Sequence, residues 1–557
     1  MKRLFALLLA VIMVLGLVAC GQKEEQPEAP AVEQTPTEEK APAAEKPEQT
    51  ETPAVEETVD PEAERYGGTF VLSWTPGDTF DPMKTSGWKS YCWAMNVYEH
   101  PLERDADGNI APGVCDFELS EDQLTMKLWV REGVTFHDGS PVEIEDVYAS
   151  LQRAKALISR MKNHYVPFVE SETIEGDVLT IKLHTFDLTT WYYFTARQTW
   201  NVVLPKEICE KYGEDGAITE VADAIGTGPY KLVEGNPGVE MVLERYDGYV
   251  PVPEGHNGVA APRKAYFDKI IVTAAGDGTT DALAVLSGER HFISMDNNLA
   301  DMLEQGGAVL AESTEQSMFY YAFNCDNPAR PVSDVNVRKA IAAALDYNEI
   351  NQLYYGRYWS ESSEPTSNPN YVSEHYANAD YHGAANVELA KEYLAKSNYN
   401  GEEVLVLVGS EDYGDPTPLM KERLAAVGIN MTAVYMDSTA QDEFILDTNN
   451  EWDMTIATGG IADYVPNTLS SKFISATWTH EEKDQLLSDI GLVPFGSEES
   501  VAMWQRIDEL LEEYCPSIIL GHTPAGTFAM SADLVWDSPD NWWYWWNSYF
   551  TNPADHP

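Results

Sequence analysis

The side chains that most often perform catalysis are present in this chain, but not in the spacings that catalysis needs. The sequence has 11 histidines, and none stands in a His-Glu-x-x-His pair that would bind zinc. No serine stands in a Gly-x-Ser-x-Gly turn, and no cysteine belongs to a local Cys/His signature. Carboxylates are too abundant for a catalytic pair to be identified. The sequence therefore favours binding without turnover, and a secreted enzyme is the competing class. No cofactor is predicted.

Two short motifs resemble chemical sites only superficially. Residues 226–229 read Gly-Thr-Gly-Pro, without the Lys-Ser/Thr of a phosphate loop and without the spacing of a dinucleotide fingerprint. His137-Asp138-Gly139 stands at a predicted strand-to-helix turn with no second metal ligand nearby. We interpret the first motif as a tight connection and the second as a hydrogen-bonded turn.

The cysteines do not form a metal-binding pattern. The chain has 6 cysteines, and those of its main part are widely spaced, without a Cys-x-x-Cys pair. This spacing argues against a zinc site. An odd number of cysteines after the N-terminal one leaves at least one free thiol, and the spacing does not give a disulfide connectivity. These residues are Cys92, Cys115, Cys209, Cys325 and Cys515.

Aromatic side chains are the other candidates for ligand contact. Trp74, Trp88, Tyr91 and Trp93 lie close together after the first predicted strand. A second aromatic group occupies residues 541–546, near the C-terminus. The first four rings either contact a ligand or fill a core, and for each single residue the core is favoured. The C-terminal rings either wall a ligand pocket or seal an interface between lobes, and the sequence leaves both roles open.

The net charge restricts the partners. Lys and Arg total 36 against 91 Asp and Glu, which gives a formal charge of −55. A surface this acidic repels phosphate backbones, so no nucleic acid is expected as a partner. It also repels anionic lipid, so membrane attachment needs a separate device.

The N-terminus predicts that device. Residues 1–3 are basic at two positions, and residues 4–18 are apolar but too few to span a bilayer, which is typical of a secretory signal peptide. Its end, residues 17–20, reads Leu-Val-Ala-Cys and resembles the lipobox of bacterial lipoproteins. The resemblance implies cleavage before Cys20 and a diacylglycerol on its sulfur. We therefore expect an extracytoplasmic protein that is lipid-anchored to the cell membrane.

Residues 21–65 differ in composition from the rest of the chain. They are rich in Glu, Pro, Ala and Thr and nearly lack large apolar side chains. Such a segment buries too little apolar surface to offset its chain entropy. We expect a disordered tether between the anchor and the folded body.

The body shows interleaved strand and helix patterns, typical of a mixed α/β protein. Residues 66–72 predict a strand, and apolar residues alternate with polar ones over 124–131, which predicts a second strand. After it, Ser140-Pro141 with Glu143 predicts a capped helix start, followed by an apolar stripe over 144–151. Ser333 or Asp334 is expected to cap another helix.

Four segments resemble, in order, the motifs of the family 5 solute-binding proteins of ABC importers. They are residues 111–142, which contain Val-Arg-Glu-Gly-Val-Thr-Phe-His-Asp-Gly-Ser-Pro-Val, residues 226–245, residues 323–341, and Ala-Asp-Tyr at 462–464. The resemblance covers residues 67–550, nearly the whole predicted body.

The resemblance implies an α/β, bilobal periplasmic-binding-protein-like fold of type II, cluster C, with an extra inserted subdomain. Lobe 1 would comprise 66–95, 218–314 and 522–557, the inserted subdomain 96–217, and lobe 2 315–521. It also implies a ligand held between the lobes. Trp74, Trp88, Tyr91 and Trp93 fall in a stretch that lines the cleft in relatives.

The fourth motif supplies the charged candidate. In peptide-binding relatives the acid at the position of Asp463 meets the ligand's α-ammonium, and Tyr464 is its neighbour. A desolvated ammonium needs a carboxylate partner, which agrees with that role. The alternative role of Asp463 is to cap a turn before Pro466.

The expected function is the extracellular solute-binding subunit of an ABC importer, a monomer that delivers peptides to a membrane permease with its ATPase. An oligosaccharide, a nickel chelate or another small solute is the alternative ligand within the same class. Scattered histidines give direct nickel ligation little support, and no metal site is predicted.

Overall fold

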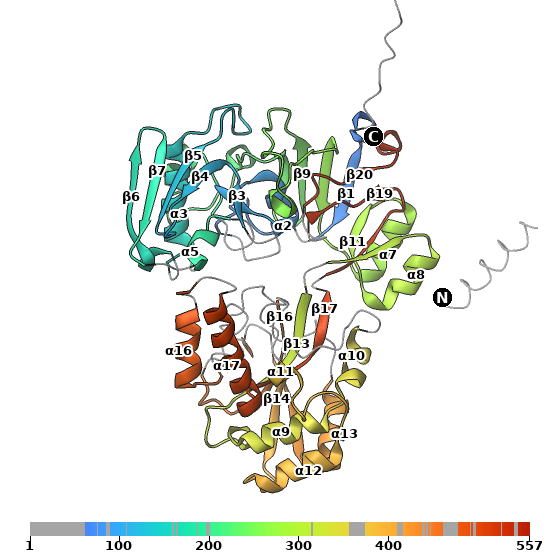
Figure 1. Cartoon of the computed structure of the whole chain (residues 1–557). Helices are drawn as coiled ribbons and strands as arrows, with labels where there is room; N and C mark the ends of the chain where they lie inside the picture. Colours follow the sequence, from blue (N-terminus) through green and yellow to red (C-terminus); the bar gives the residue numbers. More distant parts are fainter. Residues whose placement is uncertain are drawn as a thin grey trace, which may run out of the picture. The chain divides into compact units, whose positions relative to one another are not determined.

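The largest sheet gathers seven strands from parts of the chain far apart in sequence (Figure 1). Strands β10, β1 and β11 run parallel, with β1 in the middle, and the outer strands pair antiparallel. The order is β12-β18-β11-β1-β10-β9-β8. The strands are β1 (Thr69–Ser73), β8 (Tyr230–Asn236), β9 (Glu240–Arg245), β10 (Lys269–Thr273), β11 (Phe292–Ser294), β12 (Val309–Glu312) and β18 (Thr527–Met530).

This computed structural model describes residues 62–557, all within the compact unit Val59–Pro557. The exceptions are residues 75, 85–89, 107–108, 159–160, 163–164, 186–187, 196–200, 314–315, 356–373, 409–415, 437–439, 442–443, 446, 461–476, 491, 494–496, 525 and 540–543.

Alternating side chains place the two faces of the seven-stranded sheet in different cores. Phe70 and Leu72 of β1 enter a large aromatic core, together with Phe528 of β18. The next residue of β18, Ala529, faces a smaller core under α7 (Gly278–Ser287) and α8 (Ala300–Gln305). This period of two is the expected consequence of strand geometry.

A second sheet has four strands in the order β4-β5-β7-β6 and belongs to the middle of the N-terminal half. Helix α3 (Ile144–Leu157) packs against it (Figure 1). Met126 and Leu128 are buried where the alternating pattern predicted a strand, so that prediction is confirmed. The strands are β4 (Cys115–Leu119), β5 (Thr125–Val130), β6 (Val169–Glu175) and β7 (Val178–Leu183). The pair β2 (Leu102–Arg104) and β3 (Ile110–Pro112) leads into β4, α5 (Leu188–Tyr192) follows β7 in the chain, and α6 (Lys206–Tyr212) packs against α3. Helix α2 (Tyr91–Val97) lies against β8 and β9 of the seven-stranded sheet.

A third sheet has five strands in the order β15-β14-β16-β13-β17. Residues 319, 321 and 323 of β13 pack against the core of α9, α12 and α13, whereas residues 318, 320 and 322 pack against that of α17. The sheet is therefore covered on both faces. Its strands are β13 (Gln316–Phe323), β14 (Glu403–Val408), β15 (Asn430–Tyr435), β16 (Met454–Gly460) and β17 (Ser517–Pro524). The helices are α9 (Val335–Ala344), α10 (Tyr347–Tyr355), α11 (Glu374–Ala377), α12 (Val387–Lys396), α13 (Thr417–Val427), α16 (Glu481–Ile490) and α17 (Glu498–Tyr514).

The predicted start of α3 is wrong by three residues. The N-cap is Glu143, and the Asp146 carboxylate accepts the Glu143 backbone N–H at 2.8 Å. Ser140 belongs instead to a closed turn before the helix, in which its carbonyl accepts the Phe136 N–H at 2.9 Å and Pro141 bridges to Thr135. The other predicted cap is confirmed at Asp334, whose side chain accepts from the Asn336 N–H at the start of α9.

The folded body also begins earlier than residue 66. Residues 63–65 form a short 3-10 turn. Glu62 accepts a hydrogen bond from the Tyr266 hydroxyl at 2.6 Å and pairs with Lys264 at 3.2 Å. Residues 62–65, the last of the predicted tether, are therefore attached to the body. The other residues of the predicted tether, 21–61, lie outside the described residues.

Candidate functional site

The carboxyl end of β1 brings together two of the predicted ligand contacts. Trp74 follows the strand directly and is largely buried. Trp93, in α2, is fully buried and donates its indole N–H to the Pro76 carbonyl at 2.7 Å. The parallel strands β10, β1 and β11 all end at this edge, where open α/β sheets usually bind their ligands. That Trp74 and Trp93 contact the ligand stays a prediction.

The side chains of the remaining predicted site residues are not described by the structure. Tyr91 begins α2, but its side chain is not described. Trp88, Asp463, Tyr464 and Cys20 lie outside the described residues. The Ala-Asp-Tyr motif begins just past β16, a strand in the middle of the five-stranded sheet.

A buried carboxylate fixes the backbone at this same edge. Asp281 in α7 accepts hydrogen bonds from the Ser73 hydroxyl at 2.8 Å and from the Gly276 N–H at 3.1 Å. Arg290 pairs with the same carboxylate. These contacts join the ends of β1 and β10 to α7, and no sequence pattern had indicated them.

The His137 turn and the 226–228 connection contact each other directly. The His137 ring accepts the Gly226 N–H at its Nδ1 (3.2 Å), and its Nε2 lies 3.0 Å from the Gly228 carbonyl, to which it donates. Burial lowers the pKa of His137 to about 4, so the ring is neutral, as this pairing requires. A Cβ on Gly226 would lie 2.1 Å from the Val97 carbonyl oxygen, which explains the glycine. The hydrogen-bonded turn and the tight connection are both confirmed as structural.

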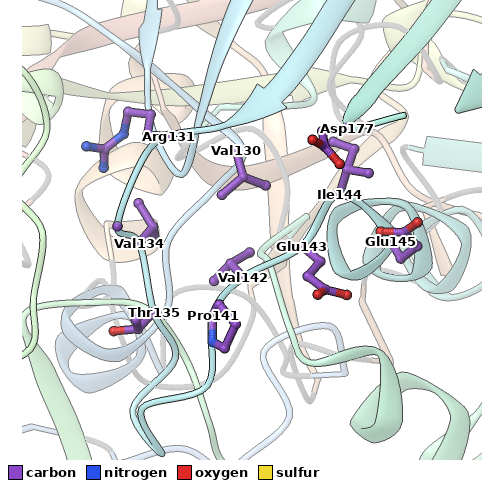
Figure 2. A pocket seen from close by; sticks show the side chains of 11 residues that line it. Val130, Arg131, Val134, Thr135, Pro141, Val142, Glu143, Ile144, Glu145 and Asp177 are labelled. Atoms are coloured by element: carbon purple, nitrogen blue, oxygen red, sulfur yellow. The ribbon is translucent and has the colours of Figure 1, made fainter. Parts of the chain in front are cut away.

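A surface pocket of about 450 Å³ lies beside this turn, between β5 and α3. Figure 2 shows the carboxylates of Glu143, Glu145 and Asp177 on one side and Arg131 pointing away from them. The Arg131 guanidinium donates instead to the carbonyls of Gly113, Pro251 and Val250. The charged side chains that the pocket presents to solvent are therefore all negative, and its apolar lining consists of Val130, Val134, Pro141, Val142 and Ile144.

A buried charge network forms just after the end of α2 in the chain. Arg263 donates to Glu99 and to Glu103, each at 2.5 Å, and stacks 4.4 Å from the Trp546 ring centroid. Tyr249 donates to Glu99 at 3.0 Å. Burial raises the pKa of Glu99 despite the Arg263 charge. The network ties residues 99–103, 249–263 and 546 together.

The cysteines after Cys20 lie within the described ranges given above. There, all five predicted body cysteines are free thiols, and four of them are buried. Burial raises the pKa of Cys325 to about 11 and that of Cys515 to about 12, so neither is a ready nucleophile. In the same described ranges, no cluster of three or more His, Cys, Asp or Glu side chains has metal-binding geometry. No described helix is both long and apolar enough to cross a membrane.

Comparison with known proteins agrees with this architecture. Residues 107–480 match the sequence model described as bacterial extracellular solute-binding proteins, family 5 Middle. A relative from Sinorhizobium fredii, named probable peptide ABC transporter periplasmic-binding protein y4tO, is 22% identical over 368 residues, which cover 63% of this chain and 67% of the relative. The glutathione-binding protein GsiB of Escherichia coli K12 is 23% identical over 65% of this chain and 68% of its own.

Solved structures show the same fold. The ABC transporter-associated periplasmic binding protein DppA of Helicobacter pylori, in complex with peptide STSA, superposes with a TM-score of 0.68 at 19% identity. The match covers 88% of this chain and 99% of DppA. The predicted fold class, a type II periplasmic-binding-protein fold, is therefore confirmed.

Proposed function

Because this chain belongs to the bacterial extracellular solute-binding proteins of family 5, we propose that it captures peptides outside the cytoplasm and delivers them to an ABC permease. The observation that carries the peptide assignment is the ligand class in the names of its relatives. One is named for peptide transport, and GsiB is named for glutathione, itself a modified tripeptide. Peptides and glutathione share a free α-ammonium group and amide bonds.

The proposed mechanism is capture between two lobes. Residues 66–95, 218–314 and 522–557 would form lobe 1, residues 96–217 its inserted subdomain, and residues 315–521 lobe 2. Only two short connections, between β12 and β13 and between β17 and β18, link the seven-stranded and five-stranded sheets among the described strands. A ligand that contacts both lobes in the closed state alone would drive closure through its differential affinity.

The recognition chemistry assigned to this site is electrostatic at one end and aromatic along its wall. Asp463 would accept the α-ammonium of the peptide, with Tyr464 beside it, and Trp74, Trp88, Tyr91 and Trp93 would provide apolar surface. A carboxylate is the group that an ammonium needs when both lose water. This arrangement binds without a nucleophile or a general base, so the chain would release its ligand chemically unchanged.

We also propose that the protein is a monomer anchored by a lipid on Cys20, with residues 21–61 as its tether. The composition of that segment and the lipobox-like end of the signal peptide support this proposal. The anchor would hold the body beside the permease and ATPase complex, and the strongly acidic surface would keep it from adsorbing to anionic lipid.

Native mass spectrometry of the full chain, followed by release and identification of any co-purified small molecule, tests the proposal. The expected result is a set of masses that fragment as peptides. The control is the same protein stripped of ligand by unfolding and refolding, which should rebind unblocked tetrapeptides more tightly than their N-acetylated forms. A single sugar or metal-chelate mass would replace the peptide assignment, and a chemically altered peptide would contradict binding without turnover.

A further inference from the structure

The C-terminal aromatic segment holds helix α2 by hydrogen bonds as well as by packing. The indole N–H of Trp545 donates to the Cys92 carbonyl at 2.8 Å. The backbone N–H of Trp545 donates to Asn96 Oδ1 at 3.0 Å, and Asn96 Nδ2 donates to the same Cys92 carbonyl at 3.1 Å. Trp545 and Asn96 are both fully buried. We name this set of contacts the Trp545 clamp.

Helix α2 depends on such contacts for its position. It has only seven residues, and its N-cap, Ser90, makes no side-chain capping bond. A helix of this length is far below the roughly 12–15 residues at which isolated helices become marginally stable. Tertiary contacts must therefore fix where α2 lies, and the clamp joins it to a segment about 450 residues later in the chain.

What α2 positions is the loop at the carboxyl end of β1. Trp93, on α2, holds the Pro76 carbonyl through its indole N–H at 2.7 Å. Pro76 lies two residues after Trp74, which follows β1 at the edge where β10, β1 and β11 end together. A series of buried contacts thus runs from Trp545 through α2 and Trp93 to Pro76, two residues after Trp74 in the chain.

We propose that Trp545 and Asn96 are positioning residues for the ligand site. They hold α2 so that Trp93 fixes the loop that carries Trp74 at the binding edge. This inference rests on the proposed function, because it assigns the peptide to that edge. Neither residue touches the ligand in this arrangement.

Trp536 provides a matched control that separates the hydrogen bonds of the Trp545 clamp from aromatic packing in the same core. It belongs to the same core, where the centroids of the stacked Trp536 and Trp545 rings lie 6.4 Å apart, and both rings contact Phe292. The buried indole nitrogen of Trp536 has no hydrogen-bond partner in the described structure. Replacing either tryptophan by phenylalanine removes the same atoms, but only Trp545→Phe removes a hydrogen bond to α2.

The test compares Trp545→Phe with Trp536→Phe in the full chain. Hydrogen exchange is followed at the backbone amides of residues 91–97, and affinity is measured by calorimetry for a defined pool of unblocked tetrapeptides. For Trp545→Phe we expect faster exchange in α2 and weaker affinity, each by about threefold to tenfold, the factor that corresponds to one lost buried hydrogen bond. Trp536→Phe should change neither, at a similar melting temperature.

Asn96→Ser is the second variant, because serine is too short to reach the Trp545 N–H, and it should reproduce both effects if Trp545→Phe does not fold. Unchanged α2 exchange in these variants would overturn the clamp. Faster exchange with unchanged affinity would overturn the positioning role. If the unmodified protein binds no peptide, the proposed function and the positioning role both fail, and the exchange data alone decide whether the clamp exists.

Discussion

The buried pair Arg153–Asp81 offers the sharpest test of what holds helix α3 to the segment that follows β1. Arg153, in α3, donates to both carboxylate oxygens of Asp81 at 3.0 and 2.5 Å. Asp81 is fully buried and also accepts the N–H groups of Met83 and Ile218. We predict that Arg153→Met leaves this carboxylate buried with backbone donors but no countercharge.

The expected loss of folding stability follows from leaving the Asp81 carboxylate buried without a countercharge. Breaking a buried ion pair by removing one partner costs about 3–5 kcal/mol. Arg153 also donates to the carbonyls of Gly213 and Gly216 at 3.0 and 3.2 Å, and these lose their donor as well. The double variant Asp81→Asn/Arg153→Met removes both charges, so it should lose less stability than Arg153→Met alone.

The assay is urea unfolding at pH 7, with Arg506→Met as the matched control. Arg506 pairs with Glu482 at 2.7 Å, but both side chains are more than one-third exposed. Such a pair contributes at most about 1 kcal/mol. A loss for Arg153→Met no larger than that for Arg506→Met would refute the reasoning, as would a double variant less stable than the single one.

Four further predictions concern single groups or segments. Burial lowers the pKa of His382 to about 3, and among the described residues its ring nitrogens have no hydrogen-bond partner. In the unfolded chain His382 binds a proton below about pH 6.5, whereas in the folded state it stays neutral down to about pH 3. Folding stability therefore falls as the pH drops from about 6.5 towards 3. His382→Phe should reduce the loss between pH 7 and pH 5 by roughly 2 kcal/mol, measured by urea unfolding at both pH values; an unchanged loss would contradict the assignment. Cys20→Ser should move the protein from the membrane fraction to the medium, and continued retention would rule out the lipid anchor. Asp463→Ala should weaken tetrapeptide binding by about 2–5 kcal/mol in calorimetry, whereas equal affinity would remove Asp463 from the site. Deleting residues 21–61 should leave the melting temperature nearly unchanged, because Glu62 is the first residue with described contacts to the body; a large drop would show that the segment is folded.

Local rules predicted the parts of the fold whose signals are local. The alternation over 124–131 gave β5, and the Asp334 cap gave the start of α9, because each depends on residues close in sequence. The start of α3 was missed for an equally local reason. Ser140 and Glu143 fit a capping box, but so do Glu143 and Asp146, and the spacing does not reveal which of the two pairs starts the helix.

The long-range polar contacts could not be predicted. Arg263 meets Glu99 and Glu103 across 164 and 160 positions, and Trp545 meets Cys92 across 453. In a chain with 91 acidic residues, no pattern singles out the few that are buried and paired. The candidate site divides in the same way: Trp74 and Trp93 were candidates because they lie close in sequence, whereas the hydrogen bond from Trp93 to Pro76 came only from the structure.

The place of β18 in the seven-stranded sheet has a consequence for the order in which the protein is made. This strand, Thr527–Met530, lies between β11 and β12, although both of those end before residue 313. Strand β12 pairs with β18 alone among the described strands. During synthesis and export, β11 and β12 therefore emerge before β18, the strand that pairs with both and that lies more than two hundred residues later in the chain. Until that partner arrives, β12 and the free edge of β11 are open to pairing with other chains, so a chaperone or rapid export would protect this protein most during its own translation.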